Sequence, residues 1–227
     1  MTYESQISFT LDTICPWTFL AKKRLDEALR RFRHSEDSKS TTFVVKYFPY
    51  QLFPETSNEG LDKYEWYKKS TYGDSEEKMK MYITLMTAYG KTAGIDFKFG
   101  GTVANTLDAH RVIQHFQGAM GLETADKIIN SLYSQYFEQE QHPSKDATLL
   151  RATRDAGIPE DEARPVIEDK NVGLIDVKAS SVTRPPMEWT ASLLFSLKGR
   201  NAISPSLEPR TWESMRRLCI RLQRRAS

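Results

Sequence analysis

The feature that most constrains the fold is a short apolar segment joined to a helical pattern by a Cys-Pro step, in the sequence ISFTLDTICPWTFLAKKRLDEAL. Residues 7–11 form a short apolar run closed by Asp12, which predicts a buried strand. Pro16 suits the first position of a helix. Residues on one side of that helix are Phe19, Leu20, Leu25, Ala28 and Leu29. The pattern therefore predicts a strand followed by a helix, with Cys15 at the helix N-terminus.

A cysteine in this position has a distinct chemistry. It faces the unpaired backbone amides and the positive end of the helix dipole, which stabilise a thiolate. Thiol pKa values in such places fall from about 8.5 toward about 3.5–7.5. We therefore predict that Cys15 is a nucleophile with a lowered pKa. The alternative, a buried cysteine that acts as a small hydrophobic residue, is less favoured by the strand–Cys-Pro–helix setting.

Residues 8–29 resemble the active-site segment of the DsbA-like thioredoxin-fold family, in particular its cytosolic dithiol oxidoreductase branch. That branch carries C-P-W-C and then a helix that starts with a K-R-R-L-type sequence. Cys15, Pro16 and Trp17 match, as does the Lys-Arg-Leu run at residues 23–25, but Thr18 stands in place of the second cysteine. Two cysteines are needed to form and resolve a disulfide within the motif, so a dithiol mechanism is excluded here.

The rest of the chain predicts an α/β, thioredoxin-like fold with a large all-α insertion domain. Residues 42–47 are rich in β-branched and aromatic side chains and predict a second strand. Helical patterns then cover residues 63–70, 75–89, 105 onward, 123–139, 147–156 and 159–168. We expect residues 1–57 to form the N-terminal half of the thioredoxin-like domain, residues 58–179 the helical insertion, and residues 180–227 an atypical C-terminal segment.

A second motif, Asn-Thr-Leu-Asp-Ala-His-Arg, begins at Asn105. Asn105 is a good helix N-cap, and Asp108 could complete a capping box. The segment is similar to the family's N-T-x-x-A-H-R-L, which implies a helix that faces the active site. The resemblance thus suggests Cys15 and Thr18 as catalytic residues and Pro16, Trp17, Asn105 and His110 as substrate-binding residues. For His110 two roles stay open: a hydrogen-bonded structural histidine, or a group that transfers protons.

The C-terminal segment departs from the family pattern. The family closes its fold with a V-P-T segment whose proline is cis, a strand, a T-G-A turn and a helix, and none of these motifs follows Arg184. Codons permitted for this segment, read one nucleotide out of frame, can give G-V-D-G-V-P-T and later L-T-G-A. We therefore hypothesise a frameshift or a mispredicted splice near Arg184. As written, residues 192–197 could form a strand and residues 213–223 a basic helix.

Composition excludes several classes of function. The formal net charge is only +2, and no predicted helix before the atypical C-terminal segment carries a basic stripe, which argues against a nucleic-acid partner. No apolar run reaches the length of a membrane span, and the first residues do not look like a signal peptide. Cys15 and Cys219 lie far apart in sequence, so we expect no structural disulfide and a reducing, cytoplasmic location. No ligand spacing typical of a metal site is present.

These observations leave three functions open. The first is a monothiol oxidoreductase in which Cys15 attacks a small-molecule disulfide and an external thiol such as glutathione releases it, with no bound cofactor. The second is a glutathione-dependent isomerase or transferase of secondary metabolism. Its relatives typically have serine at the position of Cys15, and its pocket could use the aromatic residues Tyr64, Trp66, Tyr67 and Tyr72. The third is an inactive remnant, because of the altered C-terminus. The oligomeric state stays open.

Overall fold

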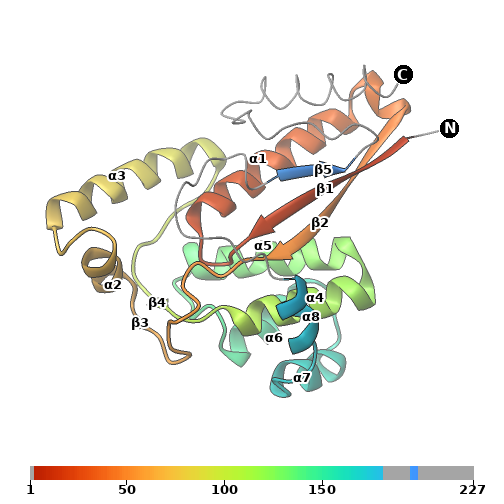
Figure 1. Cartoon of the computed structure of the whole chain (residues 1–227). Coiled ribbons are helices and arrows are strands. Elements are labelled where there is room, and N and C mark those ends of the chain that lie inside the picture. The colour runs from red at the N-terminus through yellow and green to blue at the C-terminus, as the bar shows by residue number, and fades with distance from the viewer. Residues whose placement is uncertain (1–2, 181–194, 199–227) are drawn as a thin grey trace.

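The computed structural model describes residues 3–180 and 195–198. Its main sheet has three strands in the order β2-β1-β5. Strand β1 (Tyr3–Leu11) is parallel to β2 (Thr41–Pro49) and antiparallel to β5 (Phe195–Lys198). Figure 1 shows β1 between the two other strands, with most of the helices gathered below the sheet. The strands predicted at residues 7–11 and 42–47 are confirmed, and both are longer than expected.

Helix α1 (Pro16–Arg33) follows β1, as the sequence predicts. Its first residue is Pro16, whose missing N–H is not needed at a helix start. Arg30, Arg31 and Arg33 lie in its last turn, where positive charge suits the helix dipole. The predicted apolar side is buried. Strand, Cys-Pro step and helix therefore form as one unit.

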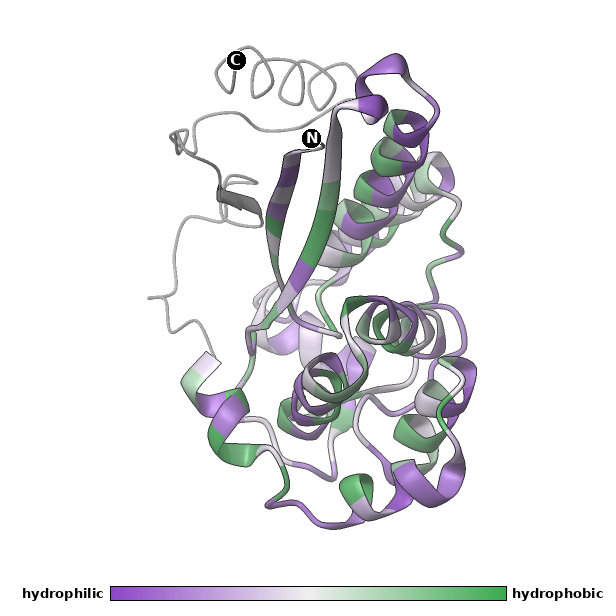
Figure 2. Cartoon of the chain, turned by 90° about the vertical axis from the view of Figure 1, so that its right-hand side faces the viewer, coloured by the Kyte–Doolittle hydropathy of each residue, from purple (hydrophilic) through white to green (hydrophobic). Residues whose placement is uncertain are grey.

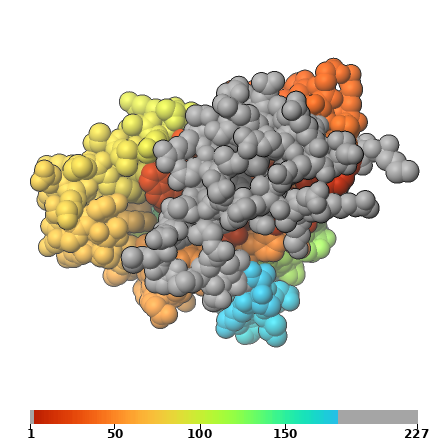
Figure 3. All heavy atoms as spheres, turned by 45° about the horizontal axis from the view of Figure 1, so that its top comes forward, coloured from red at the N-terminus to blue at the C-terminus, as the bar shows by residue number. Residues whose placement is uncertain are grey.

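The remaining helices follow β2 along the chain. They are α2 (Lys63–Ser70), α3 (Glu76–Ala93), α4 (Leu107–Met120), α5 (Leu122–Phe137), α6 (Asp146–Asp155), α7 (Glu160–Glu168) and α8 (Leu174–Ser180). Between them lie the short 3₁₀ helix η1 (Glu36–Lys39) and the two-stranded sheet of β3 (Leu61–Asp62) and β4 (Thr102–Val103). Figure 2 shows hydrophobic and hydrophilic stretches on the same helices, as expected for amphipathic elements. In Figure 3, α2 and α3 form a projecting side of the molecule. The division into three domains stays a prediction.

The helix starts show where local sequence signals hold. Asp74 and Ser75 are both suitable N-caps for α3, and the structure uses Ser75, whose hydroxyl accepts a hydrogen bond from the backbone N–H of Lys78. The predicted capping box at Asn105 is wrong. The N-cap of α4 is Thr106, and Asp108 pairs with Arg111 instead of returning to the helix start. Because the Asn105 side chain accepts from the N–H of Leu107, it still satisfies one free amide of this helix end.

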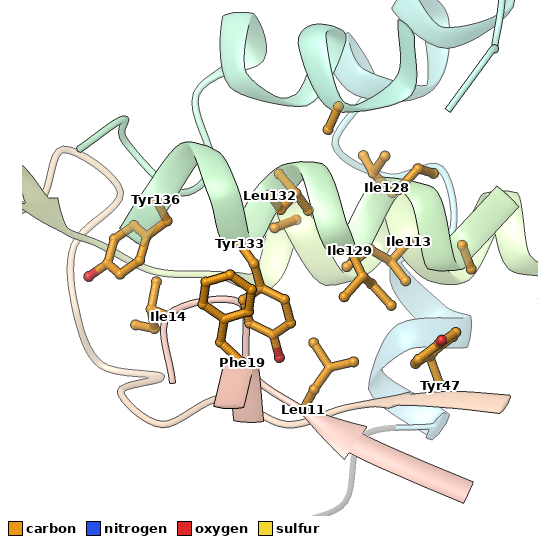
Figure 4. Close-up of a cluster of buried hydrophobic side chains, with 14 of the residues drawn as sticks. Leu11, Ile14, Phe19, Tyr47, Ile113, Ile128, Ile129, Leu132, Tyr133 and Tyr136 are labelled. Carbon is orange, nitrogen blue, oxygen red and sulfur yellow. The ribbon is translucent and has the colours of Figure 1, made fainter. Parts of the chain in front are cut away.

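Aromatic rings join α1 to α5 in the core. The ring of Phe19 stacks on that of Tyr133, with centroids 4.7 Å apart, and on that of Phe137 at 5.5 Å. Figure 4 shows Phe19 and Tyr133 in contact above Leu11, with Tyr136 beside Ile14. The end of β1, the start of α1 and helix α5 therefore share one hydrophobic core.

Two further findings concern the ends and surface of the fold. The strand expected at residues 192–197 overlaps β5 at residues 195–197, and its first three residues lie outside the described part of the chain. The basic helix expected at residues 213–223 also lies outside it. Within the described part of the chain, no helix is both long and apolar enough to cross a membrane.

Candidate active site

Cys15 is the N-cap residue of α1, which confirms the predicted geometry. Its backbone N–H donates to the carbonyl of Asp12 at 3.0 Å, and its carbonyl accepts from Phe19 at 3.2 Å. The first bond closes a tight turn after β1, and the second begins the helix. The cysteine is free, but only 2% of its surface is exposed.

The prediction that the pKa of Cys15 is lowered is wrong. The pKa of this thiol is raised to about 11, mainly by burial, and the negative charge of Asp12 acts in the same direction. Hydrogen bonds from Thr18 and from the backbone of Trp17 act in the opposite direction and do not overcome burial. The reason is that a dry site penalises the charged thiolate more than the helix N-terminus stabilises it. Cys15 is therefore a protonated thiol at neutral pH.

Thr18 fills the position of the second cysteine and is fully engaged. Its hydroxyl lies 3.0 Å from the carbonyl oxygen of Asp12 and 2.9 Å from that of Cys15, to which it can donate. The hydroxyl oxygen of Thr18 also accepts a hydrogen bond from the Tyr133 hydroxyl at 2.8 Å. Thr18 is 1% exposed. These hydrogen bonds hold the turn that contains Cys15 in place and connect this turn to α5.

His110 and Asp12 meet beneath this turn. The Nε2 atom of His110 lies 3.4 Å from Oδ1 of Asp12, and both side chains are at most 1% exposed. The carboxylate also accepts from the backbone N–H of Leu52 at 2.6 Å and from that of Ile14 at 3.3 Å. Asp12 is a site residue that was not predicted from the sequence. Its position three residues before Cys15, where an aspartate can form a turn with its own backbone, was the available signal.

The other predicted binding residues lie further from the thiol. Trp17 points outward with 46% of its surface exposed, and its ring contacts that of Tyr89 at 5.6 Å between centroids. Asn105 uses its side chain to join Gln51 and Pro54 to the start of α4. Pro16 is buried at the first position of α1. The structure therefore places Cys15, Thr18 and His110 around Asp12. Asn105 instead makes hydrogen bonds that join neighbouring segments of the chain.

In the described part of the chain, no group of three or more His, Cys, Asp or Glu side chains is placed to hold a metal ion. Cys219 lies outside the described residues.

Comparison with known proteins identifies the family. The sequence profile of the DSBA-like thioredoxin domain matches residues 6–176. No curated protein matches the chain.

Several solved structures share the fold. A probable DsbA oxidoreductase from Streptomyces coelicolor has a TM-score of 0.76 and 18% identity, covering 98% of this chain and 92% of that one. A 2-hydroxychromene-2-carboxylate isomerase has a TM-score of 0.58 and 11% identity, covering 98% and 100%. The cytosolic disulfide reductase DsbM from Pseudomonas aeruginosa, solved with glutathione, has a TM-score of 0.54 and 12% identity, covering 96% and 100%.

Proposed function

The chain belongs to the DSBA-like thioredoxin domain family, and we propose that it is a monothiol oxidoreductase with Cys15 as its single nucleophile. The observation that carries the proposal is the placement of Cys15 at the N-cap of α1, where the neighbouring groups of Trp17 and Thr18 act to lower the pKa of the thiol against the effect of burial. These groups offset burial only in part, so the species that reacts is the small fraction of Cys15 present as thiolate. Thr18 rules out a disulfide within the motif, so we take the co-substrate to be an external thiol such as glutathione. The glutathione-bound DsbM relative supports this choice of thiol.

The reaction has two balanced exchange steps. The Cys15 thiolate attacks one sulfur of a disulfide, a mixed disulfide forms, and the other sulfur leaves as a thiolate that takes up a proton. The glutathione thiolate then attacks the substrate sulfur of this mixed disulfide. Cys15 is released as a thiolate, and glutathione remains linked to the substrate sulfur. No bound cofactor or metal takes part. We propose a reducing compartment such as the cytoplasm for this chemistry, because it keeps glutathione and Cys15 in their thiol forms.

The raised pKa of Cys15 favours a second candidate function, a glutathione-dependent isomerase or transferase of small-molecule metabolism. A thiol with a pKa of about 11 is protonated at neutral pH, and it can donate a hydrogen bond to a glutathione thiolate. In the related branches a serine hydroxyl has this role. The fold shared with the isomerase is consistent with this candidate.

A serine variant separates the two functions. If Cys15 is the nucleophile, Cys15→Ser abolishes the glutathione-dependent reduction of bis(2-hydroxyethyl) disulfide, and Cys219→Ser, the matched control, leaves it unchanged. If Cys15 only donates a hydrogen bond, Cys15→Ser still binds glutathione in a calorimetric titration. Disulfide reduction that survives in Cys15→Ser would exclude the first function. A wild-type protein that neither reduces the disulfide nor binds glutathione is an inactive remnant.

A further inference from the structure

Helix α3 carries a row of apolar side chains that the described part of the chain leaves uncovered. Met81, Leu85 and Tyr89 are 66%, 46% and 38% exposed. Because they are spaced by four residues, they lie in one row along the helix. A different face of α3 is buried, through Met79 and Met86, and Figure 1 shows this helix at one end of the molecule. The exposed row is therefore not needed for the core of the fold.

The row is continuous with the rim of the candidate active site. The ring of Tyr89 contacts that of Trp17, which is 46% exposed and follows Cys15 by two residues. We call Met81, Leu85, Tyr89 and Trp17 the α3 stripe. A large side chain has about 200 Å² of surface, so the exposed fractions amount to about 400 Å². Single exposed apolar residues are normal, but a contiguous patch of this size is among the largest on a monomer and often marks an interaction site.

Charges at the two ends of α3 are complementary to a second copy of the same helix. Glu77 lies in the first turn and Lys91 in the last turn, and they are about 12 and 9 Å along the axis from Leu85. Both side chains are exposed, and neither forms an ion pair with another described residue. In an antiparallel pair that crosses at Leu85, Glu77 of each copy comes near Lys91 of the other. A parallel pair would instead bring like charges and like helix ends together.

We propose that the α3 stripe is the interface of a homodimer, in which two copies of α3 pack antiparallel about a twofold axis at Leu85. Met81 of each copy then packs against Tyr89 of the other, and Glu77 pairs with Lys91 at both ends. The contact is isologous, so one surface serves both copies. The stripe supplies about half of the area that each partner buries in a standard interface, so the dimer is weak and forms at micromolar concentrations. Pairing does not depend on the proposed function, but it places the second copy beside the rim of the candidate active site.

The test is sedimentation equilibrium of the full chain with a reducing agent, which prevents disulfide links through Cys219. We expect the wild type to change from monomer to dimer across the micromolar range. Leu85→Asp places two like charges at the twofold axis and weakens the dimer about tenfold or more. The matched control is Thr84→Asp, because Thr84 is also exposed but lies about a quarter turn away from the stripe. This control leaves the dissociation constant unchanged, and both variants keep the circular dichroism of the wild type.

An exchange of charges gives a second, independent measurement. Glu77→Lys and Lys91→Glu each weaken the dimer several-fold, and the double variant regains the wild-type dissociation constant, because the pair forms again with its charges exchanged. A wild-type chain that stays monomeric at submillimolar concentration, or a dimer that Leu85→Asp leaves intact, would overturn the proposal. A monomer that binds an apolar dye and loses this binding in Leu85→Asp would also overturn it, and would assign the stripe to a different partner. Cys15→Ser keeps the dimer, so a failure of the proposed redox function and a failure of this interface give different results.

Discussion

At the scale of single residues, two effects compete at Cys15. Amides at the start of α1 stabilise a thiolate, and burial together with Asp12 destabilises it. Burial is the larger effect because the whole side chain is removed from water. The position of the sulfur could be predicted from the sequence, but its protonation state could not.

The first prediction concerns the alkylation of Cys15 in a Cys219→Ser background. We expect the rate with iodoacetamide to keep rising up to about pH 11, because only the thiolate reacts. The urea-unfolded chain, in which the thiol has its ordinary pKa near 9, is the control. Between these two pKa values the folded state binds more protons than the unfolded state, so stability decreases as pH rises from 9 to 11. A folded-state midpoint below that of the unfolded chain would contradict this prediction.

The second prediction concerns Thr18→Cys. The substitution places a thiol three residues after Cys15, across the first turn of α1, and restores the C-P-W-C motif. We expect the oxidised variant to contain an intramolecular disulfide and to gain insulin-reduction activity that wild type lacks, measured by turbidity and thiol counting. The variant loses the Tyr133–Thr18 hydrogen bond, which costs about 1 kcal/mol of stability. Thr18→Ser keeps the hydroxyl and is the control without gained activity. Two free thiols after oxidation would count against the prediction.

At the scale of elements, charged side chains join helices that are distant in sequence. Arg111 of α4 is 0% exposed and donates to the carbonyl of Ile167, in the last turn of α7, at 3.2 Å and to that of Val172, beyond this helix, at 2.9 Å. It thus satisfies free carbonyls at the C-terminal end of α7. On the sheet side, Lys22 of α1 is also fully buried and contacts Asp26 at 2.6 Å and Asp126 of α5 at 2.8 Å. These contacts fix α5 against α1, where Tyr133 reaches Thr18.

The third prediction tests this connection with Lys22→Met. Removing the cation leaves Asp26 and Asp126 without their shared positive charge, although Asp126 still accepts hydrogen bonds from Tyr47 and Asn130. Breaking a buried ion pair typically costs about 3–5 kcal/mol. Because both carboxylates are partly exposed, we expect about 2–4 kcal/mol, measured by urea denaturation at pH 7. Lys39→Met removes a cation from an exposed pair with Glu36 and is the matched control, with no measurable loss. Equal stabilities of the two variants would show that Lys22 does not join the helices.

At the scale of the whole molecule, the match to the family ends at residue 176, before the segment that departs from its pattern. Beyond residue 180 the structure describes β5, which extends the sheet by pairing Phe9 with Phe195 and Gln6 with Lys198. The hypothesis of a frameshift near Arg184 concerns this same part of the chain.

The fourth prediction is therefore made for the coding DNA. We expect the frame displaced by one nucleotide to encode a V-P-T segment from about Met187 and a T-G-A turn from about Ala202, without an intervening stop codon. Sequencing of genomic and complementary DNA across Arg184 checks this. The restored chain should also be more stable to urea than the present one, because the family's closing strands and helix would cover more of the sheet. A stop codon in that frame would end the hypothesis.

The sequence by itself determined the local features of this protein. It specified β1, α1 and the place of Cys15 at their junction. The hydrophobic periodicity, the position of the proline and the turn residues determine these features, and each depends only on residues that are close in the chain. Only the tertiary structure decided what surrounds the sulfur. His110 is about a hundred residues from Asp12 in the chain, and Tyr133 is 115 residues from Thr18. Burial and pairing at such separations depend on how helices pack, and for this reason the thiol predicted to be acidic is held protonated by the fold.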